Sequence, residues 1–197
     1  TGNIKNIADM PCNPSIGGSA KGIVVREIDA LGGEMGINAD KTHLQIKMLN
    51  MKKGPGVRSL RAQACKDNYS KEMINTLKKS DNLTILEDLA KEVIVSNNVI
   101  KGIITESGKE ILGRAVIITT GTYLNSDIMF GSNKQKGGPH GEKNSMFLSK
   151  SLADHGINII RLKTGTPPRV LKKSIDLSEV KIENGDDCLL SFSNFYE

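Results

Sequence analysis

One cysteine lies in a loop whose composition suits a reactive thiol. Cys12 stands between Pro11 and Asn13-Pro14, and the glycine pair Gly17-Gly18 follows a few residues later. The thiolate is the nucleophilic form of cysteine, and an exposed position beside glycine amides can stabilise it. A half-buried loop cysteine without a chemical role is the alternative, and residue types alone favour that alternative.

The other cysteines and the histidines give weaker chemical signals. Cys65 falls on the apolar face of a predicted helix and Cys188 in an acidic segment, so both are interpreted as structural. The absence of a Cys-x-x-Cys pair argues against a disulfide framework, a zinc site and a disulfide reductase. Because His43, His140 and His155 show no metal-ligand spacing, we assign no metal. Free thiols fit a reducing, cytoplasmic compartment.

Basic side chains are concentrated in one segment. Residues 41–79 hold ten Lys or Arg and only two acids, whereas the last part of the chain is acidic. Arg58 and Arg61 are expected at the start of a helix, with Lys52 and Lys53 just before it. Because free amides at a helix N-terminus favour anions, this cluster predicts a phosphate or RNA contact. Salt bridging to a neighbouring acidic loop explains the same residues equally well.

The first part of the chain is predicted to form helices, and the part from residue 83 onward is predicted to form mainly strands. A helix is predicted over 19–31, ended by Gly32-Gly33, and a long helix over 57–79, with one face formed by Cys65, Tyr69, Met73 and Leu77. Strands are expected over 83–86, 93–95, 99–105 and 110–112, the last three as an antiparallel meander. The β-branched run 115–119 predicts a buried parallel strand that ends at Thr120-Gly121. A loop over 123–144, a helix over 145–155 and a strand over 157–162 complete the expected order.

Length and composition limit the class of protein. The chain has 197 residues, a net charge of +5 and no apolar run of the ~20 residues that a membrane span needs. The order of elements is that of the later half of a dinucleotide-binding α/β domain, without the Gly-x-Gly-x-x-Gly fingerprint. Because the chain begins at Thr1 and stops after an apolar step, we expect an internal fragment of a longer protein.

Three motifs carry a resemblance to a known family. Residues 12–18, 53–63 and 161–169 resemble the MnmG family, also called GidA, of flavin-dependent tRNA wobble-uridine modification enzymes. Residues 29–33 and 119–122 extend the resemblance. It implies an α/β fold with part of a Rossmann-like FAD-binding domain over 1–125, including the meander, and the entry to an inserted NAD-side domain over 126–197.

The resemblance also implies a reaction, its cofactors and its partners. Together with the GTPase MnmE, the family adds a (carboxymethyl)aminomethyl group to C5 of the tRNA wobble uridine. Methylenetetrahydrofolate gives the one-carbon unit, and FAD and NADH handle the electrons. We expect a cytoplasmic homodimer away from membranes for the full-length protein, and no activity for this fragment alone.

Site residues follow from the same match. Cys12 is expected to act as the catalytic nucleophile. The resemblance implies FAD contacts at Asn13, Pro14, Ile16, Gly17, Gly18, Ala90, Thr120, Gly121 and Ser145. Four cations are candidates for tRNA or cofactor phosphates: Arg58, Arg61, Lys163 and Arg169.

Two other functions stay open from the sequence. One is another FAD-dependent oxidoreductase, such as the folate-dependent tRNA methyltransferase TrmFO. The other is a non-catalytic RNA-binding module that uses the basic segment. The second is weakened because the sequence shows no aromatic pair typical of a base-stacking platform.

Overall fold

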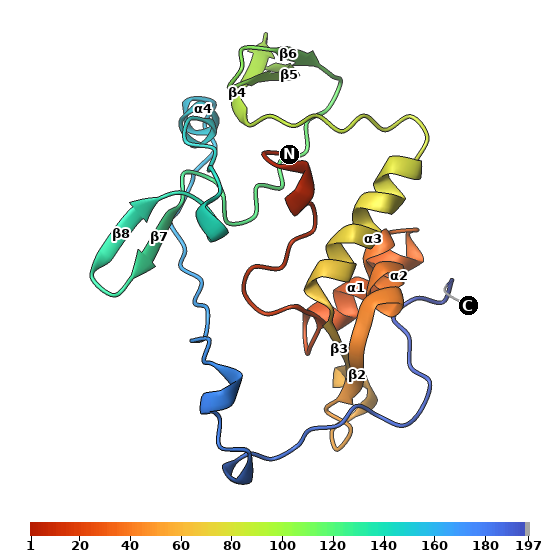
Figure 1. The fold of residues 1–197 in the computed structure, drawn as a ribbon. Coiled ribbons are helices and arrows are strands. Elements are labelled where there is room, and N and C mark those ends of the chain that lie inside the picture. The colour runs from red at the N-terminus through yellow and green to blue at the C-terminus, as the bar shows by residue number, and fades with distance from the viewer. Residues whose placement is uncertain (196–197) are drawn as a thin grey trace. The chain divides into compact units, whose positions relative to one another are not determined.

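The computed structural model describes residues 1–195 and divides into two compact units. Unit 1 combines Thr1–Ile4 with Thr84–Lys163, and unit 2 combines Lys5–Leu83 with the chain from Thr164 onward (Figure 1). Unit 1 includes residues on both sides of position 125. The division at 125/126 refers to the domains of a longer protein, and it stays a prediction.

A three-stranded antiparallel sheet forms the centre of unit 2. Ile16, Ala62 and Ile46 lie opposite one another across the three strands and are buried together on one face. The strands lie in the order β1 (Ser15–Gly17), β3 (Ser59–Ala64) and β2 (His43–Leu49). The central strand is therefore β3, which follows the loop that holds Lys52 and Lys53.

Three helices pack around this sheet. Val25 of α1 and Tyr69 of α3 are buried in the same core as the sheet residues. The Gly32 and Gly33 amides donate to the carbonyls of Asp29 and Ile28, which ends the first helix as expected. The helices are α1 (Lys21–Ala30), α2 (Glu34–Thr42) and α3 (Lys66–Lys79), and short 3₁₀ turns cover Ile4–Asn6 and Pro55–Val57.

The acidic C-terminal segment also belongs to the core of unit 2. Phe192 is fully buried. The Asp40 carboxylate accepts hydrogen bonds from the Phe192 and Ser193 amides, each at 2.8 Å, and Asp29 accepts one from Asn194 at 3.1 Å. Two buried carboxylates thus hold a segment in which the sequence pattern was weak. Two more 3₁₀ turns, Lys172–Ser174 and Leu177–Glu179, precede it.

Unit 1 contains an antiparallel meander, one helix and a hairpin. Leu148 and Leu152 of the helix are buried, and the helix packs on the first meander strand. The meander comprises β4 (Ala90–Ser96), β5 (Val99–Thr105) and β6 (Glu110–Leu112), the helix is α4 (Leu148–Asp154), and a 3₁₀ turn covers Pro139–Gly141. The hairpin consists of β7 (Asp127–Phe130) and β8 (Asn133–Lys136).

Several sequence predictions are confirmed. The fold is mixed α/β, the meander forms over its predicted strands, and helices occupy most of 19–31 and 145–155. None of the helices in residues 1–195 is long and apolar enough to cross a membrane.

Other predictions are wrong, each for a physical reason. Residues 59–64 form a strand, not the start of a helix, because pairing with β1 and β2 on both sides outweighs the helix propensity of Leu, Arg, Gln and Ala. The run 115–119 joins none of the three sheets of the described residues, and Ile117 is 88% exposed. The strands expected at 83–86 and 157–162 also lack a pairing partner within residues 1–195.

Other elements were missed, among them β1 and β2 of unit 2. The loop expected over 123–144 contains the β7–β8 hairpin, and α2 was not predicted. The first turn of α2 follows the stop signal Gly32-Gly33 directly, so the two helices are separated by a very short link.

Candidate functional site

Backbone hydrogen bonds fix the cysteine loop to the sheet of unit 2. The Pro14 carbonyl accepts from the Ala64 amide at 2.8 Å, and the Ser15 amide donates to the Asn13 carbonyl at 2.7 Å. Cys12 is partly exposed and Asn13 is exposed. The loop therefore presents a thiol from a fixed edge of the sheet.

The third sequence motif meets this loop. Cys12 Sγ lies 3.1 Å from Thr166 Oγ1 in a hydrogen bond that either atom can donate. Arg169 Nη2 donates to the Pro11 carbonyl at 2.8 Å and to the Cys12 carbonyl at 3.2 Å. Two predicted site residues, Cys12 and Arg169, are thus brought together across more than 150 positions of sequence. Thr166 lies within the motif 161–169 but was not predicted as a site residue.

The predicted flavin contacts at residues 16–18 differ in whether the fold leaves space beside them for a ligand. The Ile16 side chain is buried in the core. Gly17 has a φ of 98°, and a Cβ there would lie 2.1 Å from the Leu60 carbonyl oxygen, so the sheet itself requires glycine. Gly18 also has a positive φ, but open space surrounds its Cβ position. Of these three residues, Gly18 is the one beside free space.

Cations surround this end of β1. Arg61 lies opposite Gly17 on one side and Lys47 on the other, and Lys21 Nζ donates to the Ser15 carbonyl at 3.1 Å. Partial burial, and secondly the charge of Arg61, lower the pKa of Lys21. Because α1 begins at Lys21 without a side-chain cap, its positive dipole end adds to this field. Lys47 is already paired with Glu183 at 3.1 Å, so Arg61, Lys21 and the α1 N-terminus are the groups that suit an anionic group of a ligand.

Lys21 and Lys47 were missed as neighbours of Arg61. Alternation along β2 is the signal that could have found Lys47, because it places that side chain on the face opposite the buried Ile46. Lys21 is the first residue of a helix that directly follows the Gly17-Gly18 pair.

The two remaining predicted cations, Arg58 and Lys163, are both exposed. Arg58 is exposed in the loop between β2 and β3 with Lys52 and Lys53, so the predicted helix N-terminus at Arg58 and Arg61 is wrong. Lys163 is exposed at the last position of unit 1. Figure 1 shows the β2–β3 loop at the far end of its hairpin from α2.

Unit 1 brings together the other predicted flavin contacts. The buried Ser145 hydroxyl donates to the Ala90 carbonyl, and the Ser145 amide donates to the Tyr123 carbonyl at 2.8 Å. The Tyr123 amide in turn donates to the Thr120 carbonyl at 3.0 Å, and Gly121 lies within this turn. Ala90, Ser145 and the Thr120-Gly121 turn are therefore linked by hydrogen bonds that run through Ser145 and Tyr123.

The groups around Gly18 are cations and a helix N-terminus, which suit an anionic group. In residues 1–195, no group of three or more His, Cys, Asp or Glu side chains converges as metal ligands would. The open space at Gly18, the α1 N-terminus and the cations Lys21 and Arg61 match an anionic portion of a cofactor. The Ser15 and Gly18 amides are already used, donating to Asn13 and Leu60.

Cations beside a glycine turn and a helix N-terminus are typical of a protein that binds an anionic group such as a phosphate. The model of the family "Glucose inhibited division protein A" matches residues 1–197. The chain belongs to this family. Its mixed fold and its three sequence motifs agree with that membership.

Comparison with individual proteins gives the same result. The chain is 53% identical to a protein of Geobacillus thermodenitrificans and 52% identical to one of Bacillus subtilis, over 97% of its own length and 30% of theirs. Both are named tRNA uridine 5-carboxymethylaminomethyl modification enzyme MnmG. The structure of Aquifex aeolicus GidA in its form I crystal matches all of this chain with a TM-score of 0.94 at 46% identity. That match covers 33% of the Aquifex chain, so the present chain spans about a third of its relatives.

Proposed function

We propose that this chain is part of a flavin-dependent enzyme that modifies C5 of the tRNA wobble uridine in the cytoplasm. Family membership and the names of the relatives support this proposal. The complete reaction would add a (carboxymethyl)aminomethyl group, with FAD, NADH and methylenetetrahydrofolate as cofactors. The GTPase MnmE would be the partner and the full-length protein a homodimer.

The contact between the cysteine loop and the third motif is the observation that carries the proposal. Three hydrogen bonds from Thr166 and Arg169 converge on Pro11 and Cys12. A loop that only closes a sheet edge does not need a thiol held by a hydroxyl from a segment so distant in sequence. The geometry supports a thiol with a fixed position.

Different residues of this chain would then have different roles in the reaction and in binding. The Cys12 thiolate would add to the pyrimidine ring and make C5 nucleophilic, with the Thr166 hydroxyl as its hydrogen-bond donor. Arg61, Lys21 and the α1 N-terminus would bind an anionic part of the cofactor, and Arg58, Lys163 and Arg169 would contact phosphates. When bound, FAD would supply electron transfer.

The nucleophile is tested in a full-length protein that contains this chain. Cys12→Ser is expected to abolish tRNA modification while FAD stays bound, whereas Cys188→Ser serves as the matched control and keeps activity. Cys188 is exposed in the acidic segment, away from the Thr166 contact. A Cys12→Ser enzyme that modifies tRNA at the normal rate excludes the nucleophile role.

The cofactor is tested in the present chain by titration with FAD, followed by flavin fluorescence. We expect a saturable change that Arg61→Glu weakens by about tenfold, since each 1.4 kcal/mol changes affinity tenfold. Lys78→Glu is the control because Lys78 is exposed in the last turn of α3 and has no proposed role in binding. Equal affinities for wild type and Arg61→Glu would remove Arg61 from the cofactor site.

A further inference from the structure

The β7–β8 hairpin of unit 1 has two chemically different faces. Residues that pair across antiparallel strands share a face, and the register pairs Phe130 with Asn133 and Asp127 with Lys136. One face therefore carries two apolar and two amide side chains: Ile128, Phe130, Asn133 and Gln135. The other face carries one methionine and three charged side chains: Met129, Asp127, Lys134 and Lys136.

The far end of the hairpin exposes its largest side chains. Phe130 is 81% exposed and Met129 is 61% exposed. A two-stranded hairpin has little stability of its own, and these two neighbouring apolar side chains are open to a binding partner. The hairpin is thus a candidate interaction surface.

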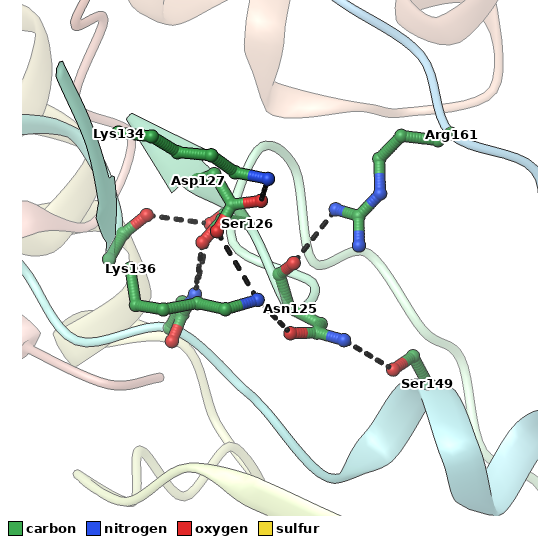
Figure 2. Close-up of polar contacts among 9 residues, drawn as sticks. Asn125, Ser126, Asp127, Lys134, Lys136, Ser149 and Arg161 are labelled. Atoms are coloured by element: carbon green, nitrogen blue, oxygen red, sulfur yellow. Dashed lines mark hydrogen bonds and ion pairs between the residues drawn. The ribbon is translucent and has the colours of Figure 1, made fainter. Parts of the chain in front are cut away.

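A single carboxylate organises the charged face (Figure 2). Asp127 forms ion pairs with Lys134 at 3.1 Å and with Lys136 at 3.2 Å, while the lysine side chains stay largely accessible. Hydrogen bonding from Lys134, and then from Lys136, lowers the pKa of Asp127, so the carboxylate is ionised at neutral pH. Because the two ammonium groups are already held in place, binding an anion there costs less side-chain entropy.

Further hydrogen bonds anchor the base of the hairpin within unit 1. Figure 2 shows Asn125 between α4 and the segment at Arg161. Asn125 Nδ2 donates to Ser149 Oγ at 3.4 Å, and its side-chain oxygen accepts from Lys136 at 3.1 Å. Arg161 Nη1 donates to the Asn125 carbonyl at 2.8 Å. The anchored base presents the exposed end in a defined orientation and adds a third cation.

We propose that the β7–β8 hairpin is a docking surface for unpaired RNA. Phe130 stacks on a base, and the amide of Asn133 on the same face bonds to a base edge. Lys134 and Lys136 on the other face, together with Arg161, would bind the phosphates of flanking nucleotides. The inference extends the proposed function, on which it rests, to a surface outside the cysteine loop.

Charge and chemistry favour RNA over a protein partner. The three cations outnumber the one carboxylate of Asp127, and this excess of positive charge is complementary to a polyanion. The aromatic ring of Phe130 lies on a face that also carries the amides of Asn133 and Gln135 beside Ile128, and this mixture of ring and amides matches the faces and edges of bases. Unpaired RNA is favoured because a duplex hides its base faces inside the stack.

The experiment measures RNA binding by the 197-residue chain with fluorescence anisotropy. A labelled RNA stem-loop with an anticodon-sized loop is compared with a fully paired duplex of the same stem. Phe130→Ala is expected to weaken stem-loop binding by about tenfold and to leave duplex binding unchanged. Lys134→Gln combined with Lys136→Gln is expected to lower the salt slope of stem-loop binding by about 1.4, for two lost phosphate contacts.

Matched controls and the overturning results complete the design. Phe147→Ala and Lys150→Gln change exposed residues of unit 1 outside the hairpin and are expected to bind like wild type. If wild type binds the stem-loop and the hairpin variants bind equally well, the hairpin assignment is wrong while RNA binding stands. If wild type binds no RNA, both the hairpin assignment and the RNA contacts proposed for this chain fail. If Phe130→Ala instead abolishes self-association in sedimentation without changing RNA affinity, the surface is a protein interface.

Discussion

Gly17 and Gly18 have the same type of backbone conformation but different surroundings. Both have φ near +100°, which a residue with a Cβ adopts at a cost of about 1–2 kcal/mol. A Cβ at Gly17 would also meet the Leu60 carbonyl at 2.1 Å and the Phe192 ring at 2.7 Å, whereas Gly18 faces open space. We therefore expect Gly17→Ala to lower the free energy of unfolding by at least 2 kcal/mol more than Gly18→Ala.

Urea unfolding of the two glycine variants, followed by circular dichroism, measures this difference. The comparison is matched because the backbone strain is common to both and only the packing differs. Equal loss of stability in the two variants would show that strain alone explains the glycine pair. If Gly18 borders the cofactor, Gly18→Ala would reduce FAD affinity. It would lower the free energy of unfolding only by the cost of the backbone strain, because no atom lies near its Cβ position.

Asp40 predicts a pH dependence of stability. Burial raises its pKa above 3.8, and this outweighs the lowering by the Phe192 and Ser193 amides and by His43, while Asp29 adds to the rise. A raised pKa means that the folded state holds the proton more tightly than the unfolded state. The free energy of unfolding therefore falls as pH rises from 3.8 through the raised value.

Removing the charge at Asp40 isolates this effect. Asp40→Asn loses one of two backbone acceptors, which costs about 1–3 kcal/mol at all pH values. The stability of wild type relative to the variant is expected to decrease as pH rises through the same interval. Urea unfolding at a series of pH values measures the difference, and a difference that does not change with pH contradicts the prediction.

The C-terminal segment shows how an element with a weak sequence pattern can be well fixed. Phe192 is fully buried and Phe195 is 65% exposed, although both lie in the same polar, acidic stretch. Phe192→Ala is expected to lower the free energy of unfolding by about 3–5 kcal/mol, and Phe195→Ala by less than about 0.5 kcal/mol. Thermal unfolding of both variants tests this, and similar melting temperatures would show that the segment does not contribute to the core.

Elements with local signals could be predicted, and elements that depend on partners could not. The α1 stop at Gly32-Gly33 and the turns of the meander are local, so their prediction is confirmed. The strand 59–64 consists largely of helix-forming residues and depends on β1 and β2 for its conformation. Likewise, the run 115–119 has strand composition but no strand beside it in residues 1–195.

The candidate site follows the same rule. Cys12 and Arg169 could be predicted because both lie in motifs that are recognisable in the sequence. The contact between them could not be predicted, because it depends on how the chain folds. Lys21, Lys47 and Thr166 were missed because their roles arise from side chains that meet across elements. The flavin contacts of individual residues stay predictions.

At the scale of the whole molecule, the chain leaves unit 2 after Leu83 and returns to it at Thr164. Residues 157–171 have no helix or strand and are exposed throughout. Exposed segments of this kind are preferred sites of proteolysis, so brief trypsin treatment is expected to cut first between Arg161 and Lys173, and also at Lys52 and Lys53. Lysines within α3 are expected to be cut later because the helix protects them.

Cleavage between 161 and 173 should not release the C-terminal piece. Phe192 stays buried, and the carboxylates of Asp40 and Asp29 still bind the amides of residues 192–194. The nicked protein is therefore expected to elute as one species in size-exclusion chromatography, whereas nicked Phe192→Ala releases the C-terminal peptide and nicked Phe195→Ala does not. Mass spectrometry of the fractions identifies the pieces. Release from nicked wild type would show that this segment is held by chain continuity and not by its buried contacts.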